Sequence, residues 1–335
     1  MNREFFINIS FLIAINLLIK PFYIFGIDRV VQNTVGKEMY GIYFALFNFT
    51  YLLQIINDFG IQNYNNRNIA QHQQLLDKYF PNILVLKFFL GIAYLAVVFG
   101  VAWLLGYEID YYPLMLVIAI NQMLVALLFY LRSNISGLAL YRTDSMISAL
   151  DKLLMIVICG YLLWWSPWRT EFKIEWFIYA QTITLSISML VAFSVVYPRL
   201  KRFRLRIKPV FLLLILKESY PYALVIFLMT LYTRIDAVMI ERLLPDGPSE
   251  TGIYASAYRL LDAVNMIGFL FAGLLLPMFS RMIKTGESVE ELLRFSFQLI
   301  WTGAIALSLN VFFFQVEIME LLYLEATPYW GQVLG

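Results

Sequence analysis

The sequence is poor in the residue types from which catalytic and metal sites are usually built. It holds one cysteine, Cys159, and one histidine, His72, among 335 residues. One cysteine cannot form an internal disulfide, and no Cys/His spacing typical of a metal site occurs. The histidine lies in a polar stretch that we expect at the surface, so no nucleophile–histidine pair can form inside an apolar segment. A G-x4-G-K-[ST] phosphate loop is also absent. The sequence therefore predicts no metal, no cofactor, no ATP-driven pumping and no enzymatic activity.

Charge is scarce as well. Charged residues make up 14% of the chain, whereas soluble domains keep about a quarter of their residues charged. Hydrophobic residues make up 61%, and the mean hydropathy is +0.72. The formal net charge of +2 argues against a nucleic-acid partner, for which a strongly basic face is expected. This composition predicts an all-α membrane protein whose surroundings are membrane lipid.

Nine stretches are long and apolar enough to cross a bilayer, which takes about 20 helical residues. They are expected near Phe5–Ile27, Tyr40–Phe59, Ile83–Leu105, Pro113–Leu131, Ile147–Trp165, Trp176–Val196, Tyr220–Ile240, Ile253–Pro277 and Leu293–Val316. The first is too long for the apolar part of a signal peptide and has no A-x-A-like cleavage site behind it. We therefore expect it to be retained as a transmembrane helix.

The stretch from Tyr197 to Pro209 is the one dense cluster of positive charge. Because short loops rich in Lys and Arg stay on the cytoplasmic side, it is interpreted as a cytoplasmic linker. The remaining loop charges place the N-terminus on the same side. The expected organisation is an N-terminal six-helix lobe (1–197), a basic linker (198–217) and a partial C-terminal lobe of three helices (218–335).

A short motif, G-x4-G-I-Y, stands before both the second and the eighth expected helix. Its glycines are Gly36 and Gly41 in one copy and Gly247 and Gly252 in the other, separated by 211 residues (252 − 41). The motif is either two ordinary glycine turns or the mark of two parallel six-helix repeats, an architecture known among transporters. On the second interpretation the C-terminal lobe is incomplete, and we expect a truncated product or a fragment of a longer transporter.

Of the ionisable side chains inside the expected spans, where charge is costly and commonly functional, five are the principal candidates. They are Lys20, Arg234, Asp236, Arg259 and Asp262. Their similar depth on three helices suggests a shared water-filled cavity, although interhelical salt bridges that only hold the bundle together are the alternative. In a functional site, the three cations would bind an anion, since Arg suits bidentate binding of phosphate oxygens. The two aspartates would be cation or proton sites.

Other residues are expected to line that cavity or to shape it. Arg259 and Asp262 are three residues apart and can pair on one helix face, and Asn265 continues their stripe. Asn48 and Tyr51 form a thinner polar stripe on the second expected helix.

Three residues near the ends of expected spans complete the candidates. Pro21 should bend the first helix, either as a gate beside the cavity or as a static packing kink. Asp58 is expected near the cytoplasmic end of its helix, exposed to solvent. Lys87 is expected to extend its ammonium group to the cytoplasmic interface.

With these residues in place, the sequence resembles the polysaccharide-biosynthesis flippases. These are the O-antigen or lipid-linked oligosaccharide translocases of the multidrug/oligosaccharidyl-lipid/polysaccharide exporter superfamily. The resemblance rests on V-G-K-E-M-Y-G-I-Y (35–43), N-D-F-G-I (57–61), T-R-I-D-A-V-M-I-E-R-L-L-P (233–245), T-G-I-Y-A-S-A-Y-R-L-L-D-A-V-N-M-I (251–267) and L-P-M-F-S-R-M (276–282). It implies a two-lobed bundle with a central cationic cavity in the bacterial cytoplasmic membrane. The cavity would take the pyrophosphate and sugars of an undecaprenyl-linked oligosaccharide and work by alternating access. Other polysaccharide-assembly membrane proteins are the further partners that the resemblance implies.

Two alternatives stay open. A cation-coupled multidrug exporter of the same superfamily would favour acidic residues in its cavity, whereas here three candidate cations outnumber two carboxylates. A membrane-embedded envelope glycosyltransferase or polymerase would need a catalytic group in a sizeable extramembrane loop, and the outer loops are too short to build one. The balance of charge therefore favours an anionic, lipid-linked substrate.

Overall fold

The computed structural model of the protein describes residues 18–200, 209–286 and 288–335, and most side chains from residue 267 to 285 fall outside that description. The described part is almost entirely helical and contains no strand. Its principal elements are η1 (Tyr23–Asp28), α2 (Arg29–Val35), α3 (Lys37–Leu52), α4 (Ile55–Asp58), α5 (Ile61–Gln71), α6 (Leu76–Leu104), α7 (Tyr112–Gly137), α8 (Tyr141–Gly160), α9 (Ile174–Val196), α10 (Pro209–Leu243), α11 (Gly247–Thr285), α12 (Glu290–Phe313), α13 (Gln315–Leu322) and α14 (Pro328–Leu334).

Seven helical segments of the described chain are long and apolar enough to cross a membrane. They are Lys37–Asp58, Gln73–Leu104, Ile109–Gly137, Tyr141–Trp165, Ile174–Arg199, Pro209–Leu243 and Glu290–Phe313. Each overlaps one expected span, so the polytopic helical fold is confirmed. Of the other two expected spans, Phe5–Ile27 is described only from residue 18 onward, and Ile253–Pro277 lies within α11.

The first described helix, called helix one below, runs over residues 18–35 and changes geometry along its length. After Pro21 the chain forms a π-helical segment, η1, before α geometry resumes in α2. Proline removes one backbone hydrogen bond of an α-helix, and a π segment is a recognised site of helix bending. The bend expected at Pro21 therefore takes the form of a π segment that begins two residues later. Helix one ends at Gly36, whose φ of +82° is a conformation that glycine adopts freely.

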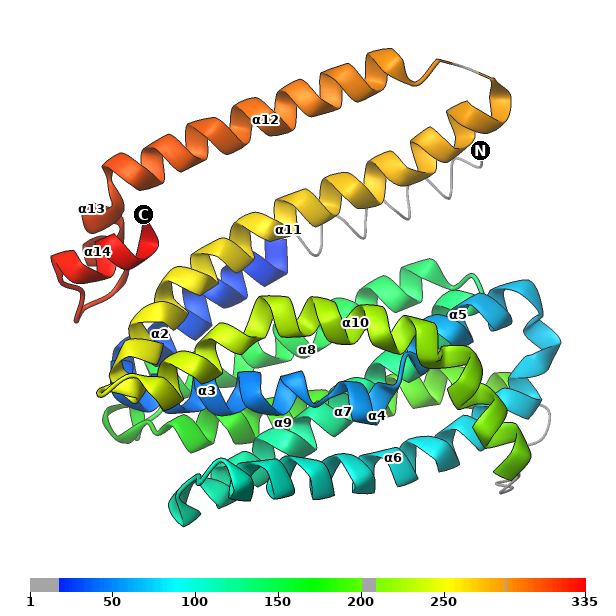
Figure 1. Cartoon of the computed structure of the whole chain (residues 1–335), viewed down its shortest axis with the longest axis horizontal. Coiled ribbons are helices and arrows are strands. Elements are labelled where there is room, and N and C mark those ends of the chain that lie inside the picture. Colours follow the sequence, from blue (N-terminus) through cyan, green and yellow to red (C-terminus); the bar gives the residue numbers. More distant parts are fainter. Residues whose placement is uncertain (1–17, 201–208, 287) are drawn as a thin grey trace.

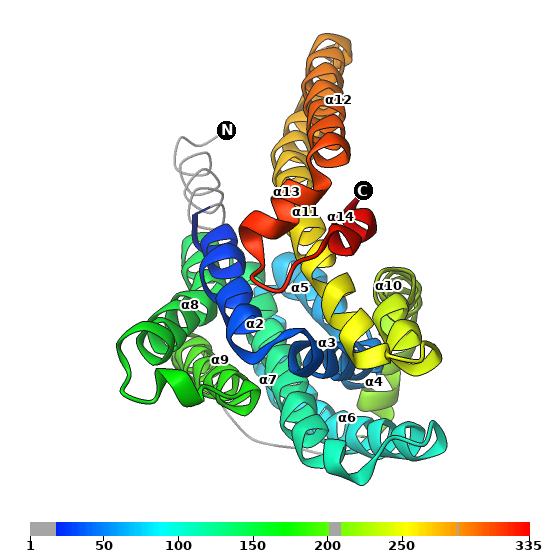
Figure 2. The same cartoon turned by 90° about the vertical axis from the view of Figure 1, so that its left-hand side faces the viewer.

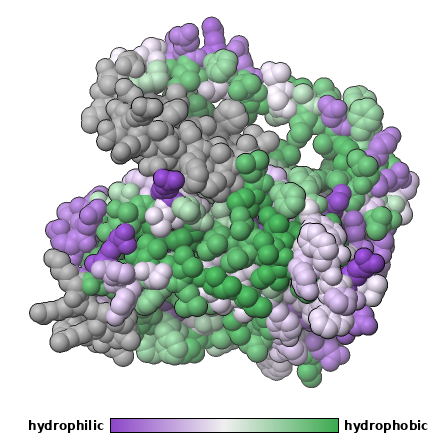
Figure 3. All heavy atoms as spheres, turned by 180° about the vertical axis from the view of Figure 1, so that it is seen from behind, coloured by the Kyte–Doolittle hydropathy of each residue, from purple (hydrophilic) through white to green (hydrophobic). Residues whose placement is uncertain are grey.

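Helix one and α3 to α10 form a bundle from which the antiparallel pair α11 and α12 projects (Figure 1). The N-terminal half of α11 packs along α3, and its C-terminal half leaves the bundle together with α12 (Figure 2). Two clusters of buried side chains fill the bundle, one centred on Tyr43 and Phe177 and the other on Phe80 and Tyr130. Seen from behind, the bundle carries a broad hydrophobic band with hydrophilic residues gathered toward its two ends, as expected of a membrane-spanning surface (Figure 3).

The short helices α13 and α14 fold back against α11 and also contact helix one. The Asn33 side chain donates to the Leu322 carbonyl oxygen at 3.0 Å and accepts from the Leu324 amide at 3.2 Å. A carboxylate oxygen of Glu325 accepts from the backbone amide of Lys37, the first residue of α3, at 3.1 Å. A negative charge at a helix N-terminus is favourable because the first amides lack intrahelical acceptors. The C-terminal segment therefore ties helix one and α3 to α11 at this end of the molecule.

The two copies of G-x4-G-I-Y meet where α3 crosses α11. A Cβ atom on Gly41 would overlap the carbonyl oxygen of Pro248, and one on Gly252 would overlap that of Lys37. Lys37 and Pro248 are themselves 211 residues apart (248 − 37) and hold the same position in the two motif copies. The second glycine of each copy therefore contacts the same backbone position of the other copy. Small residues let membrane helices approach closely. Gly41 and Gly252 are therefore packing residues at a locally two-fold symmetric crossing.

Two expected boundaries are wrong. The polar stretch around His72, residues 63–78, was expected to be a surface loop. It is largely the helix α5 followed by the start of α6, and only His72 and its neighbours connect the two helices. The linker expected over 198–217 ends at residue 208, because α10 begins at Pro209. Residues 201–208, which carry most of its charge, lie outside the described residues. The assignment of 1–197 and 218–335 to two lobes stays a prediction.

Lys87 and Asp58 also differ from expectation. The Lys87 ammonium lies 2.5 Å from Asp58 Oδ1 and 3.3 Å from the Asn57 carbonyl oxygen, with only 4% of its side chain exposed. It does not extend to an interface. Instead it crosses from α6 to α4, just after α3 is interrupted at Leu53 and Gln54. A buried ion pair of this kind stabilises little as a pair but is costly to break from one side.

The glycine crossing makes a first prediction. Gly41→Ala and Gly252→Ala should each lower the thermal unfolding temperature of the detergent-solubilised protein, since the new methyl group meets backbone that cannot move aside. Overpacking of this kind costs about 1–3 kcal/mol. Gly100→Ala is the matched control, because a Cβ atom there meets nothing within 4 Å. Unchanged stability in both crossing variants would contradict the close approach.

The buried ion pair makes a second prediction. Lys87→Met should destabilise the protein by about 3–5 kcal/mol because Asp58 is left without its counter-charge. Lys87→Met combined with Asp58→Asn should recover most of that loss. Chemical denaturation of both variants in the same detergent would measure it. A double variant no more stable than the single one would show that the pair matters for a reason other than charge.

Candidate functional site

Arg259 on α11 lies at the centre of a network of charged groups. Its Nε atom is 2.6 Å from Oδ2 of Asp28, at the end of η1 in helix one. The Tyr40 hydroxyl, from α3, donates to the same carboxylate oxygen at 2.8 Å and accepts from Arg259 Nε at 3.2 Å. Asp28 is 1% exposed. Helix one, α3 and α11 therefore meet at one buried carboxylate.

Asp262 extends the network to α10. Its Oδ2 lies 3.6 Å from Arg259 Nη1, and its Oδ1 lies 3.8 Å from Nη2 of Arg234. Both distances exceed those of a close charge-assisted hydrogen bond, about 2.7–2.9 Å. About a fifth of the Asp262 side chain is exposed. Asp262 is thus held loosely between two guanidinium groups.

Aromatic rings surround both guanidinium groups. The Arg234 guanidinium carbon lies 5.0 Å from the ring centroid of Tyr258 and 5.6 Å from that of Tyr51, while that of Arg259 lies 5.2 Å from Phe44. Cations are attracted to aromatic faces at such distances. The rings therefore hold the guanidinium groups in place without using their hydrogen-bond donors.

Several polar atoms of this region are buried and have no hydrogen-bond partner among the described residues. They are Oδ1 of Asp28, Nη1 of Arg234 and Oδ1 of Asn48. Buried donors and acceptors are normally paired, and each exception calls for an explanation such as a water molecule, an ion or a ligand. An unpaired guanidinium N–H can bind an oxygen of an anion. The arrangement can therefore hold a phosphate-like group at Arg234 and Arg259.

The structure brings together three of the five predicted charges. Arg234, Arg259 and Asp262 form the network described above, and Asp262 lies within reach of Arg259 as their spacing predicted. Asp236 points elsewhere on α10 and accepts from the Tyr254 hydroxyl at 3.2 Å. The charges that act on Lys20 are those of Arg132 on α7 and of Asp151 and Lys152 on α8. The single cavity expected to hold all five is therefore not what the described contacts show.

The predicted lining residues are divided in the same way. Tyr51 lies against Arg234, and Asn48 is buried one turn before it on α3, with its amide donating to the Phe44 carbonyl oxygen at 2.7 Å. Asn265 is exposed on α11. Pro21 precedes the π segment whose last residue is Asp28. Pro21 thus lies just before the π segment of helix one, and Asp28 at the end of that segment links helix one to α11.

Asp28 and Tyr40 were missed by the sequence analysis. The first span was expected to end at Ile27, so Asp28 and the following Arg29 looked like loop charges at a membrane surface. The helix in fact continues to Val35, and Asp28 stays inside it. The sequence held one signal for them. Asp28 lies shortly before the first copy of G-x4-G-I-Y and Tyr40 lies within it, and this part of the chain contacts α11.

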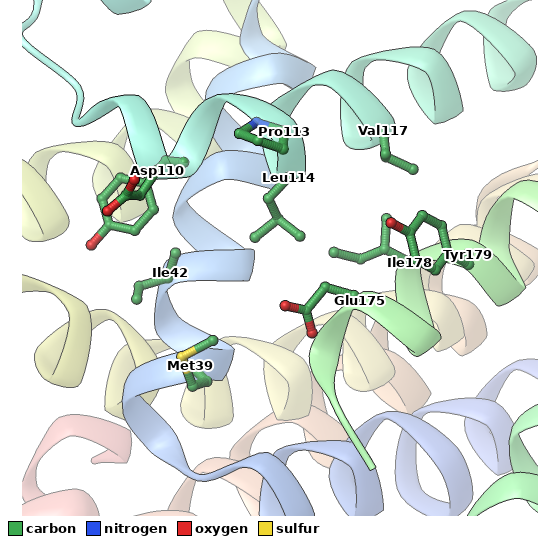
Figure 4. A pocket seen from close by; sticks show the side chains of 10 residues that line it. Met39, Ile42, Asp110, Pro113, Leu114, Val117, Glu175, Ile178 and Tyr179 are labelled. Atoms are coloured by element: carbon green, nitrogen blue, oxygen red, sulfur yellow. The ribbon is translucent and has the colours of Figure 1, made fainter. Parts of the chain in front are cut away.

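A separate, partly open pocket of about 240 Å³ lies between α3, α9 and the start of α7 (Figure 4). Its walls are mostly apolar, and the carboxylates of Asp110 and Glu175 lie at it from two different elements. None of the predicted site residues lines it. Over the described residues, no group of three or more His, Cys, Asp or Glu side chains is placed to hold a metal ion.

The comparisons with known proteins give one positive result. A family model described as polysaccharide biosynthesis protein matches residues 6–283, which includes all the residues of the charged network. The chain belongs to this polysaccharide biosynthesis protein family. No curated protein and no solved structure matches the chain significantly. Membership places it among multi-pass membrane proteins of polysaccharide biosynthesis, as the resemblance read from the motifs predicted.

Proposed function

We propose that the protein is a flippase that moves an undecaprenyl-pyrophosphate-linked oligosaccharide across the bacterial cytoplasmic membrane by alternating access. Arg234 and Arg259 bind the pyrophosphate, and Tyr51 and Tyr258 flank it. The observation that carries the proposal is the pair of guanidinium groups on adjacent helices, one with a buried N–H that has no partner among the described residues. A pyrophosphate has anionic oxygens on two phosphorus atoms, so one ligand can bridge both groups.

The charge balance alone no longer favours an anion, because Asp28 adds a carboxylate to the site. The hydrogen-bond partners of the charged groups give a further argument. Asp28 pairs with the cation Arg259 through Oδ2, which also accepts from Tyr40, whereas Nη1 of Arg234 is a buried donor with no hydrogen-bond partner among the described residues. A cation-coupled drug exporter would need the reverse, with free carboxylates and paired cations. The proposal of an anionic substrate is therefore kept, and Asp236 and Asp262 remain candidates for ion or proton coupling.

The other parts of the proposal follow from the same arrangement. Helix one, bent near Pro21 and joined to α11 through Asp28, is suited to act as the gate. Lys20 would contact the sugar or phosphate from another part of the bundle, since the charges that act on it lie on α7 and α8. The membrane lipid would be the second partner along the hydrophobic band, and the N-terminus and the basic linker would be cytoplasmic.

The proposal predicts a sharp difference between arginine and lysine. Arg234→Lys and Arg259→Lys should each lower transport of a fluorescent lipid-linked oligosaccharide in proteoliposomes by roughly tenfold, because an ammonium cannot reproduce the planar fork that binds two oxygens. Quenching of the label by an impermeant reductant would measure the translocated fraction.

Arg242→Lys is the matched control for this experiment. Arg242 lies on the same helix as Arg234, eight residues further on, and pairs with Glu241 outside the network. Its replacement should leave transport within about twofold of wild type, because lysine keeps the charge of this exposed residue and surface ion pairs contribute little. Near wild-type transport by both site variants would remove the arginines from the substrate site.

A further inference from the structure

We infer that Asp28 is an internal competitor of the substrate. Asp28 occupies Arg259 until an anionic ligand replaces it, and this exchange releases helix one from α11. The inference rests on the proposed function, since it names what the ligand must displace. It concerns a residue that touches no substrate itself and acts through Arg259. Asp28 is in this sense a positioning residue.

The first step of the argument is the one-sided geometry of the pair. Both donors that reach Asp28, Arg259 Nε and the Tyr40 hydroxyl, go to Oδ2, while Oδ1 is buried without a partner among the described residues. A bidentate Arg–carboxylate pair would satisfy both oxygens and hold more tightly. The pair is therefore close but incomplete, and a ligand with better geometry can exchange for it.

The second step is the position of the ligand. A phosphate that bridges Arg234 and Arg259 comes to the edge of the guanidinium where Asp262 now lies at 3.6 Å and 3.8 Å. Asp262 can turn to solvent because it is partly exposed. Asp28 is 1% exposed and reaches solvent only if helix one moves away from α11, since a buried carboxylate without its counter-charge is costly. The negative charge of the ligand thus competes for Arg259 with a carboxylate that has no other cation among the described contacts.

The third step is the consequence for the fold. Asp28 joins helix one to α11 through the centre of the network, and the neighbouring links on this side are neutral hydrogen bonds. Gln32 donates to the Gly252 carbonyl oxygen at 2.9 Å, and Asn33 bonds to the segment after α13. Exchange of Asp28 for the ligand removes the ionic link, and the neutral bonds alone hold helix one less firmly, so the contact of Asn33 with residues 322–324 is made less of the time. Binding energy is in this way used for the conformational step rather than for tight binding alone.

The experiment measures binding and turnover of the same variants. In the full chain, Asp28→Asn should bind a short-chain prenyl diphosphate roughly tenfold more tightly than wild type, since the competitor has lost its charge. Its transport rate at saturating lipid-linked oligosaccharide should fall, because the ligand no longer has an ionic link to release. A residue needed only for structure would weaken binding and transport together. Asp28→Glu, which keeps the charge, should restore wild-type affinity to within about threefold.

Glu241→Gln is the matched control. Glu241 is likewise a buried carboxylate beside an arginine and accepts from a tyrosine hydroxyl, that of Tyr107, at 3.2 Å. It lies outside the network, so its neutralisation should leave the dissociation constant of the prenyl diphosphate within about twofold of wild type. Equal tightening in this variant would assign the effect to net charge and overturn the role of Asp28.

A second measurement covers the case in which Asp28→Asn does not fold. With Cys159 replaced by Ala, cysteines at positions 33 and 324 should cross-link, since Asn33 and the Leu324 amide are in contact. The prenyl diphosphate should slow that reaction in the Asp28 protein and should have no effect once Arg259→Ala is added. A cross-linking rate that the ligand does not change would overturn the inference. If the wild-type protein binds no prenyl diphosphate at all, the proposed function fails as well, which separates the two outcomes.

Discussion

The close approach of α3 and α11 is the constraint on which the rest of the arrangement depends. Gly41 and Gly252 let the two backbones meet without side chains between them. That contact brings Tyr40 of α3 against Arg259 of α11, and helix one, which leads into α3, adds Asp28 at 2.6 Å from the same arginine. Any larger residue at the crossing would separate the helices and, with them, the charged groups. The site is therefore a product of backbone packing before it is a product of electrostatics.

Charged residues inside the bundle are of two kinds, and their surroundings distinguish them. Lys87 and Asp58 form a close pair whose ammonium group also bonds a backbone carbonyl oxygen, so its demands are largely met within the protein. Arg234 and Asp262 are farther apart, and a buried N–H of the arginine has no partner among the described residues. The first pair has the features of a structural link. The second is the looser arrangement that the proposed binding of an anionic substrate requires.

The sequence predicted the helical membrane fold well because continuous apolar runs report directly on burial in lipid. It also identified Arg234, Arg259 and Asp262, since charge inside such runs is rare. It could not predict their partners, because the spacing of three residues between Arg259 and Asp262 suggested a local pair, while the shorter contact comes from Asp28, more than 200 residues away. Lys20 was grouped with the others by depth alone, and depth does not say which side of a helix a residue takes. The helix α5 was missed because its polar surface gave no apolar run to detect.

The π segment in helix one has a consequence for Asp28. A π-helical turn contains one residue more than an α-helical turn, so every residue after it is rotated relative to a regular helix. One residue of an α-helix corresponds to a rotation of roughly 100°. If Tyr23–Asp28 returned to α geometry while the preceding turn stayed fixed, the Asp28 carboxylate would turn away from Arg259 by about that angle. The extra residue in this turn is therefore what aims the carboxylate at α11, and the ion pair lasts only as long as the wider turn does.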